Sequence, residues 1–296
     1  MRTEFDYMEK DGGACVTKVF SPGAACVIPE SLGGLPVTEL SDRLFAGTGV
    51  EEVYLPAGLK KIGKYAFYNC ERLSLFDVHG AATEIGGGLF NGCRNIREIR
   101  LHMERGARSG LRDFVTEING RLTVRFFFMQ EDGTEREEAR LIFPLYYDEA
   151  VENTPARIIS SSIHGTGQKY RYCFEDRKVR FDRYDKLFPL EKYEEDVFLA
   201  AEIAVCRLRH PAELSAEAKG EYEAFLREHL SELLYQAVKD EDLFFWLFGQ
   251  FGESLGQSDL DRLILAASEK KKAGISGRLM EEKRRRFGAK KELFEL

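Results

Sequence analysis

Apolar positions recur with a fixed period in the first third of the chain. Three phenylalanines lie 22 and 23 residues apart, and these are Phe45, Phe67 and Phe90. Each of them follows an aliphatic residue by five positions, namely Leu40, Ile62 and Ile85. A period of 20–50 residues is typical of solenoids, in which each unit buries its apolar side only by stacking on its neighbours. We therefore predict a β-solenoid with ladders of Phe, Leu and Ile in its core.

Each unit of this repeat contains a short segment that predicts a strand, at residues 53–55, 76–78 and 99–101. The residues that flank the inward aliphatic side chains are expected to project from the sheet, and they are Glu52, Tyr54, Leu75, Asp77, Glu98 and Arg100. Solenoids commonly bind partners on an extended exposed face. These six residues are therefore the candidate binding surface, and the alternative is that they are ordinary solvated side chains.

The repeat also carries a recognisable consensus. The matching pieces are Val27-Ile28-Pro29, Gly34-Leu35-Pro36-Val37-Thr38, Ile62-Gly63, Ala66-Phe67, Asn69-Cys70 and Asn91-Gly92-Cys93. They resemble the BspA-like leucine-rich repeats of bacteria, whose units read I-P-x-x-V-T-x-I-G-x-x-A-F-x-x-C-x-x-L. The resemblance covers about residues 13–102 and implies a leucine-rich-repeat solenoid with an interaction role.

The chain departs from that consensus in two places. Ala46-Gly47-Thr48 replaces the piece that ends in Cys, and Gly87-Gly88 stands where Ala is expected. About three units are near the lower limit for an independent core, so we expect the solenoid to lean on the rest of the chain. Cys70 and Cys93 occupy matching positions, which favours small buried ladder residues over redox or metal chemistry.

After a glycine-containing linker at residues 105–110, the period changes to two. Alternation over residues 122–128, a turn at 131–134 and an apolar segment at 139–143 predict a β-hairpin. Further on, His164, Gly165, Gly167 and Arg171 form a candidate ligand loop, because backbone N–H groups near a helix that starts at Gln168 can hold an anion. The alternative is a simple turn between strand and helix, since the dinucleotide fingerprint is incomplete.

Helical periodicity begins near residue 193. It predicts one helix over 195–209 and another that starts after Ser215. A weaker repeat of 30–32 residues aligns Leu233 with Leu263 and Ala237 with Ala267. This pattern resembles ankyrin-type helical hairpins over about residues 230–287, although the T-P-L-H signature is absent.

Together these patterns predict an α+β protein with three parts. Residues 1–105 form the BspA-like leucine-rich-repeat solenoid with an N-terminal cap, residues 111–190 form a small mixed α/β middle unit, and residues 191–296 form an all-α, ankyrin-like helical-hairpin repeat domain.

Composition then narrows the function. A net charge of −7 argues against nucleic acid as the main partner. Six cysteines without a C-x-x-C pair and five histidines without H-E-x-x-H spacing offer no catalytic or metal motif, so we expect no enzyme activity, no cofactor and no metal. No apolar run reaches about 18 residues and no secretory leader is evident, which predicts no membrane span and a cytoplasmic location.

The leading functional hypothesis is a non-enzymatic protein–protein interaction or scaffold protein with an unidentified protein partner. One alternative is a cell-surface adhesin whose leader is absent from this sequence. Another is a small-ligand or enzyme site at the loop from His164 to Gly167.

Overall fold

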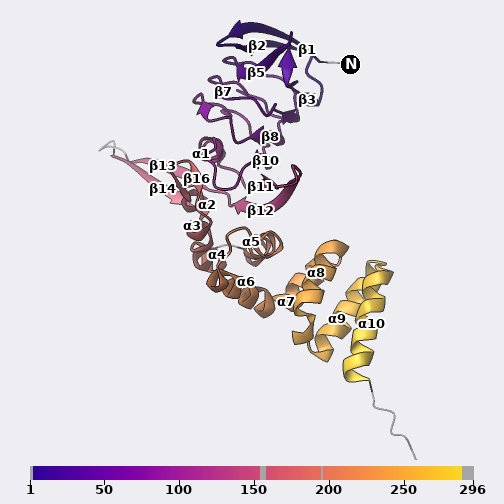
Figure 1. The fold of residues 1–296 in the computed structure, drawn as a ribbon. Helices are drawn as coiled ribbons and strands as arrows, with labels where there is room; N and C mark the ends of the chain where they lie inside the picture. Colours follow the sequence, from indigo (N-terminus) through magenta and orange to yellow (C-terminus); the bar gives the residue numbers. More distant parts are fainter. Residues whose placement is uncertain (1–2, 154–157, 195, 289–296) are drawn as a thin grey trace, which may run out of the picture. The chain divides into compact units, whose positions relative to one another are not determined.

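The computed structural model describes residues 3–153, 158–194 and 196–288. The chain divides into two compact units, residues 1–218 and 219–296, each of which is traced in Figure 1. The first unit combines strands with short helices and the second is helical, which confirms the predicted α+β class. The three-part division predicted from the sequence differs from these two units in its boundaries, and it stays a prediction.

The first unit begins with an antiparallel hairpin and continues as a β-solenoid of about five turns. Its strands are β1 (Glu4–Lys10), β2 (Gly13–Phe20), β3 (Ala25–Val27), β4 (Ser31–Leu32), β5 (Leu35–Leu40), β6 (Glu52–Tyr54), β7 (Lys61–Ile62), β8 (Leu75–His79), β9 (Glu84–Ile85) and β10 (Glu98–Met103). One sheet has the order β1-β2-β5-β7-β9, and β10-β8-β6-β3 forms part of the other. The predicted repeat strands are present, and the solenoid has more turns than the three units that the phenylalanines mark.

Aromatic stacking holds successive turns together. The rings of Phe45 and Phe67 are stacked 5.0 Å apart, and those of Phe67 and Phe90 lie 6.0 Å apart. All three side chains are buried. Because each ring removes a large apolar area from water only when its neighbour is present, the ladder couples the stability of adjacent turns.

The predicted hairpin is formed by β11 (Leu122–Met129) and β12 (Glu135–Phe143). It also continues the solenoid, because β11 pairs in parallel with β10 and gives the second sheet the order β12-β11-β10-β8-β6-β3. The connection contains helix α1 (Leu111–Thr116), whose Phe114 packs edge-on against Phe76 at 5.3 Å. The solenoid therefore shares its core with the segment that follows it.

The rest of the first unit is built from short elements. They are β13 (Tyr147–Asn153), β14 (Ile158–His164), α2 (Gly167–Tyr170), β15 (Phe174–Glu175), β16 (Lys178–Val179), α3 (Phe181–Asp185), α4 (Phe188–Glu194) and α5 (Val197–Arg209). Helix α5 packs on β12. Its Arg207 forms a buried bidentate pair with Asp185 at 2.8 and 3.0 Å, and Tyr184 donates to the Ile142 carbonyl at 2.6 Å.

The second unit contains most of α6 (Ala216–Glu228) and two helical hairpins. These consist of α7 (Leu230–Ala237) with α8 (Glu241–Phe251) and α9 (Gln257–Glu269) with α10 (Ala273–Phe287), the two hairpins being linked by a 3-10 turn over Gly252–Ser254. Leu233, Ala237, Leu263 and Ala267 are all buried at the aligned positions. The hairpin repeat is thus visible, while its ankyrin-type identity stays a prediction. Within the described residues, no helix has the length and apolar character needed to cross a membrane.

Candidate functional site

The predicted strand face is a continuous ladder on the sheet of β6, β8 and β10. Glu52, Leu75 and Glu98 lie opposite one another in one row, and Tyr54, Asp77 and Arg100 form the next. Five of these side chains are partly exposed. Leu75 is a correction to the prediction, because this side chain between Glu52 and Glu98 is only 8% exposed.

The charges of this face are paired with one another. Tyr54 donates to Glu52 at 2.7 Å, and Arg100 donates to Glu98 at 2.6 Å. Arg125, on the adjacent β11, also approaches Glu98 at 3.4 Å. The face therefore presents a fixed charge pattern rather than a set of independent solvated groups.

The same pattern continues onto the hairpin, which the sequence did not place beside the repeats. Glu137 of β12 accepts from Arg125 at 2.5 Å and from Arg140 at 2.6 Å. Burial raises the pKa of Glu137, but the hydrogen bonds and charges of the two arginines outweigh it and lower the pKa to about 2. The alternation of β11 was visible in the sequence, whereas its register against β10 was not.

A histidine cluster borders this face. The His102 ring is stacked 4.9 Å from both His79 and Phe127. His102 Nδ1 lies 2.6 Å from Glu135, and Nε2 makes a looser contact with Asp77 at 3.2 Å. Burial lowers the pKa of His102, but the two carboxylates bring it above its ordinary value, while burial lowers the pKa of His79. No group of three or more His, Cys, Asp or Glu residues in the described chain could hold a metal ion.

The predicted ligand loop has a different construction from the one expected. Arg171 is only 1% exposed, and its guanidinium donates to backbone carbonyls at 2.7–3.1 Å, those of Val115, Ile118, Gly120, Pro144 and Gly167. Burial lowers its pKa to about 10. Arg171 therefore ties neighbouring chain segments together and does not face a ligand, which corrects the prediction for this residue.

The other residues of the predicted ligand loop form a compact turn between β14 and α2. The His164 ring is stacked 4.9 Å from that of Tyr147, and Gly165 has a φ of +85°. A Cβ at Gly167 would lie 2.0 Å from the Pro144 carbonyl oxygen, so only glycine fits there. Helix α2 does begin close to Gln168, but it is a single turn of four residues.

The last solenoid turn forms a second candidate site, because each turn donates a row of backbone N–H groups to the next. Arg43, Phe45 and Gly47 donate to the carbonyls of Lys64, Ala66 and Tyr68 at 2.7–3.0 Å. Tyr65, Phe67 and Asn69 donate in the same way to Gly87, Leu89 and Asn91 at 2.8–3.3 Å. The equivalent donors of the following turn are Gly88, Phe90 and Gly92, and no further repeat turn follows them in the described chain.

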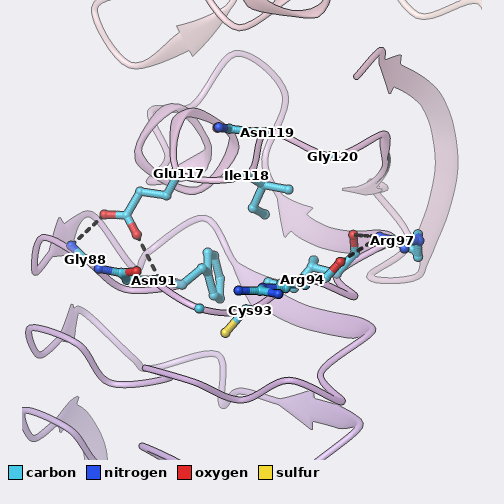
Figure 2. Close-up of a pocket in the computed structure, with 12 residues that line it drawn as sticks. Gly88, Asn91, Cys93, Arg94, Arg97, Glu117, Ile118, Asn119 and Gly120 are labelled. Atoms are coloured by element: carbon cyan, nitrogen blue, oxygen red, sulfur yellow. Dashed lines mark hydrogen bonds between the residues drawn. The ribbon is translucent and has the colours of Figure 1, made fainter. Parts of the chain in front are cut away.

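Glu117 takes the place of that missing turn for two of the three donors. Its carboxylate accepts from Gly88 N at 2.8 Å and from Phe90 N at 2.9 Å, as Figure 2 shows. Beside it lies an open pocket of about 660 Å³. Its lining includes Asn91, Gly92, Cys93, Arg94, Arg97 and Asn119. Sequence reasoning missed this site, because Glu117 lies 29 and 27 positions after Gly88 and Phe90, whose N–H groups donate to it.

Cys93 shows how this turn differs from the preceding one. Cys70 and Cys93 donate to the carbonyls of Phe45 and Phe67 at 3.0 and 2.9 Å, so both take part in the ladder as predicted from their matching positions. Cys70 is fully buried, but Cys93 is only half-buried because no turn covers it from the other side.

Comparisons with known proteins bear on the N-terminal part of the chain. Residues 33–106 match a family model described as a BspA type leucine rich repeat region, with six copies. A crystal structure of a leucine-rich repeat protein from T. pallidum is 22% identical over 37% of this chain and 76% of that chain, with a TM-score of 0.22. The comparison with curated proteins finds no match. The consensus read from the sequence, the stacked turns and the family model agree on leucine-rich repeats of the BspA type within residues 33–106.

Proposed function

We propose that this chain is a non-enzymatic interaction or scaffold protein that binds a protein partner on the exposed face of its leucine-rich-repeat sheet. The BspA-type repeat suggests a role in protein–protein interaction or adhesion. The binding face consists of Glu52, Tyr54, Asp77, Glu98 and Arg100, and it extends onto Arg125 and Arg140 of the hairpin.

The observation that carries this proposal is the mutual pairing of the exposed charges. Glu98 accepts from both Arg100 and Arg125, so its side chain is already held before any partner arrives. Ordering long side chains is one of the main costs of association, and a surface that is ordered in advance avoids much of that cost. A fixed pattern of charges also favours one complementary partner over others.

Two alternatives use different features. An adhesin would use the same strand face outside the cell, whereas we propose a cytoplasmic partner. A ligand site at the loop of His164 is less well supported, because the buried Arg171 donates to backbone carbonyls of the chain itself.

The test is affinity capture from extracts of the source organism with the full chain as bait. We expect a specific protein to be retained by the chain and lost when Glu52→Lys and Glu98→Lys are combined. The matched control combines Glu71→Lys and Glu84→Lys, which reverse two exposed glutamates away from this face. Equal loss in both double variants would indicate a general charge effect, and retention in both would place the binding surface elsewhere on the chain.

A further inference from the structure

We propose that the pocket at the end of the solenoid binds a carboxylate group of a partner protein, with Gly92 N–H, Arg94 and Arg97 as its ligand-binding groups. This inference rests on the proposed interaction function and assigns a chemical class to one contact. Its starting point is the row of backbone donors that the last repeat turn leaves behind.

Gly92 N–H is the third donor of that row, and no described residue accepts from it. The equivalent N–H groups, Gly47 and Asn69, donate to Tyr68 and Asn91 of the following turns. All three residues have positive φ, at +72°, +54° and +85° for Gly47, Asn69 and Gly92, so the backbone turns in the same way at each position. In the described part of the chain, Gly92 N–H meets no protein acceptor. An oxygen atom from outside the chain would complete the row.

The chain itself indicates which chemical group suits such a position. At the two neighbouring donors, a carboxylate replaces the carbonyls of a following turn, with one oxygen on Gly88 N and the other on Phe90 N. A charged acceptor makes a stronger hydrogen bond with a backbone N–H than a neutral one does. The adjoining donor is thus suited to a second carboxylate of the same kind.

The charge of the pocket favours an anion. Its charged lining residues are Arg94, Arg97 and Glu117, so two cations and one anion give a formal charge of +1. The charge of Glu117 already faces two N–H groups. Among the residues that the structure describes, Arg97 Nη1 contacts only neutral carbonyls, those of Arg94 at 3.3 Å and Ile96 at 3.2 Å. The side chain of Arg94 has no ion pair within the described residues.

The arrangement of the pocket brings these groups to one opening. Figure 2 shows Arg94 between Cys93 and Arg97, with Asn119 and Gly120 on the other side of the pocket. Arg94, Arg97 and Asn119 are exposed, so a partner can reach them without any movement of the chain. A guanidinium is well matched to the two oxygens of a carboxylate, which it can bind in bidentate fashion.

The experiment follows the backbone amide resonances of the isotope-labelled full chain by NMR during titration with small probes. N-acetyl-glutamic acid N-methylamide represents a side-chain carboxylate, N-acetyl-diglycine represents a chain terminus, and inorganic phosphate represents a different anion. We expect one or both carboxylate probes to shift the Gly92 amide downfield in a saturable way. The Gly88 and Phe90 amides serve as internal controls, because their acceptor is already in place. The stronger carboxylate probe identifies the source of the group.

Substitution of the cations provides the second readout. Arg94→Gln combined with Arg97→Gln should weaken the binding of the carboxylate probe about tenfold or more, because charge-assisted hydrogen bonds are lost. Arg112→Gln, at an exposed arginine of α1 outside the pocket, should leave the affinity unchanged. Both variants should keep the amide spectrum of the remaining chain.

Three results would overturn the assignment: no saturable shift with either carboxylate, binding of phosphate at least as tight as that of the carboxylates, or unchanged affinity in the double variant. The result is independent of partner capture. A Gly92 response together with failed capture would remove the proposed function and leave the carboxylate site. Capture that depends on Glu52 and Glu98, together with no response of Gly92, would support the proposed function and overturn the carboxylate site.

Discussion

Successive repeats are joined by different means in the two units of this protein. In the solenoid, each turn donates backbone N–H groups to the next, as in the bonds from Phe45 to Ala66 and from Phe67 to Leu89. In the described part of the helical unit, backbone hydrogen bonds run within the helices, and side chains join the hairpins, as in Ser231 to Asp259 at 2.8 Å. A stack joined through its backbone ends in a row of donors that a following turn would accept, whereas a stack of helices leaves its unpaired backbone groups at the ends of each helix.

The largest effects are expected from core substitutions, which test how far a local loss of stability extends to neighbouring repeats in each unit. Phe67→Ala should destabilise the solenoid by about 4 kcal/mol, and Leu263→Ala should destabilise the helical unit by about 3 kcal/mol, because both remove buried apolar volume. Hydrogen exchange should show that Phe67→Ala lowers protection of the inter-turn amides of Phe45, Phe67 and Asn69 together. Loss at Phe67 alone would contradict coupling through the backbone rows.

The second-largest loss of stability is expected when the buried guanidinium of Arg171, in the first unit, is removed. Arg171→Met should cost about 3 kcal/mol in unfolding free energy, because several buried carbonyls lose their donor. Urea unfolding measures the effect. Arg112→Met, at an exposed arginine, should change stability by less than about 0.5 kcal/mol, and a similar loss in both variants would refute the tying role of Arg171.

The carboxylate of Glu117, which caps the last donor row, should contribute less to stability than Arg171 does. Glu117→Gln should destabilise the last turn by about 2 kcal/mol, because the amide offers one acceptor oxygen where the carboxylate offers two. The expected signature is faster exchange of the Gly88 and Phe90 amides, with the Phe67 amide less affected. Glu84→Gln, at an exposed glutamate, is the matched control, and unchanged exchange in Glu117→Gln would rule out the cap.

The paired charges of the strand face should give a pH dependence. The pKa of Glu137 is about 2 in the folded chain and lies below its ordinary value of 4.5, so its ionised form stabilises the fold above pH 4.5. This contribution should be lost as the pH falls from about 4.5 to about 2. After allowance for solvent screening, we expect about 1 kcal/mol.

Denaturant unfolding at several pH values checks this prediction. Glu137→Gln should remove that part of the acid sensitivity. If the variant and the parent chain lose stability equally over this range, other carboxylates are responsible.

The smallest effect is expected on the surface of the helical unit. Glu223 pairs with Lys219 and Arg227 on one face of α6, and all three residues are solvated. Glu223→Gln should change stability by less than about 0.5 kcal/mol in thermal unfolding. A loss as large as that of Glu117→Gln would erase the difference between the two kinds of stack.

Much of this architecture could be predicted from the sequence because it depends on local periodicity. The spacing of Phe45, Phe67 and Phe90 predicted the stacked rings, and the alternation over residues 122–128 predicted the hairpin. The pairing of β11 with β10 was not predictable, because a parallel register depends on the path of the connecting segment. For the same reason, neither the cap at Glu117 nor the pairing of Arg125 with Glu98 was foreseen.

The residues of the candidate binding surface could also be predicted only in part, because local alternation does not show which side chains their neighbours cover. Alternation correctly placed Glu52 and Asp77 on the outward side of their strands, but it cannot measure how far neighbouring side chains cover a residue such as Leu75. In the loop after β14, glycines next to a histidine and cations suggested anion binding. The fold instead uses Arg171 against carbonyls from segments up to 56 residues earlier in the sequence.

The identical donor rows also make the solenoid modular in length. Duplication of the 23 residues from Gly63 to Ile85 would insert a turn that accepts from the row before it and donates to the row after it. The exposed sheet would grow by one strand width, about 4.8 Å, while the terminal turn and its capping glutamate stayed the same. The length of the exposed sheet can therefore change with the number of repeats, while the first and last turns of the solenoid keep their sequences.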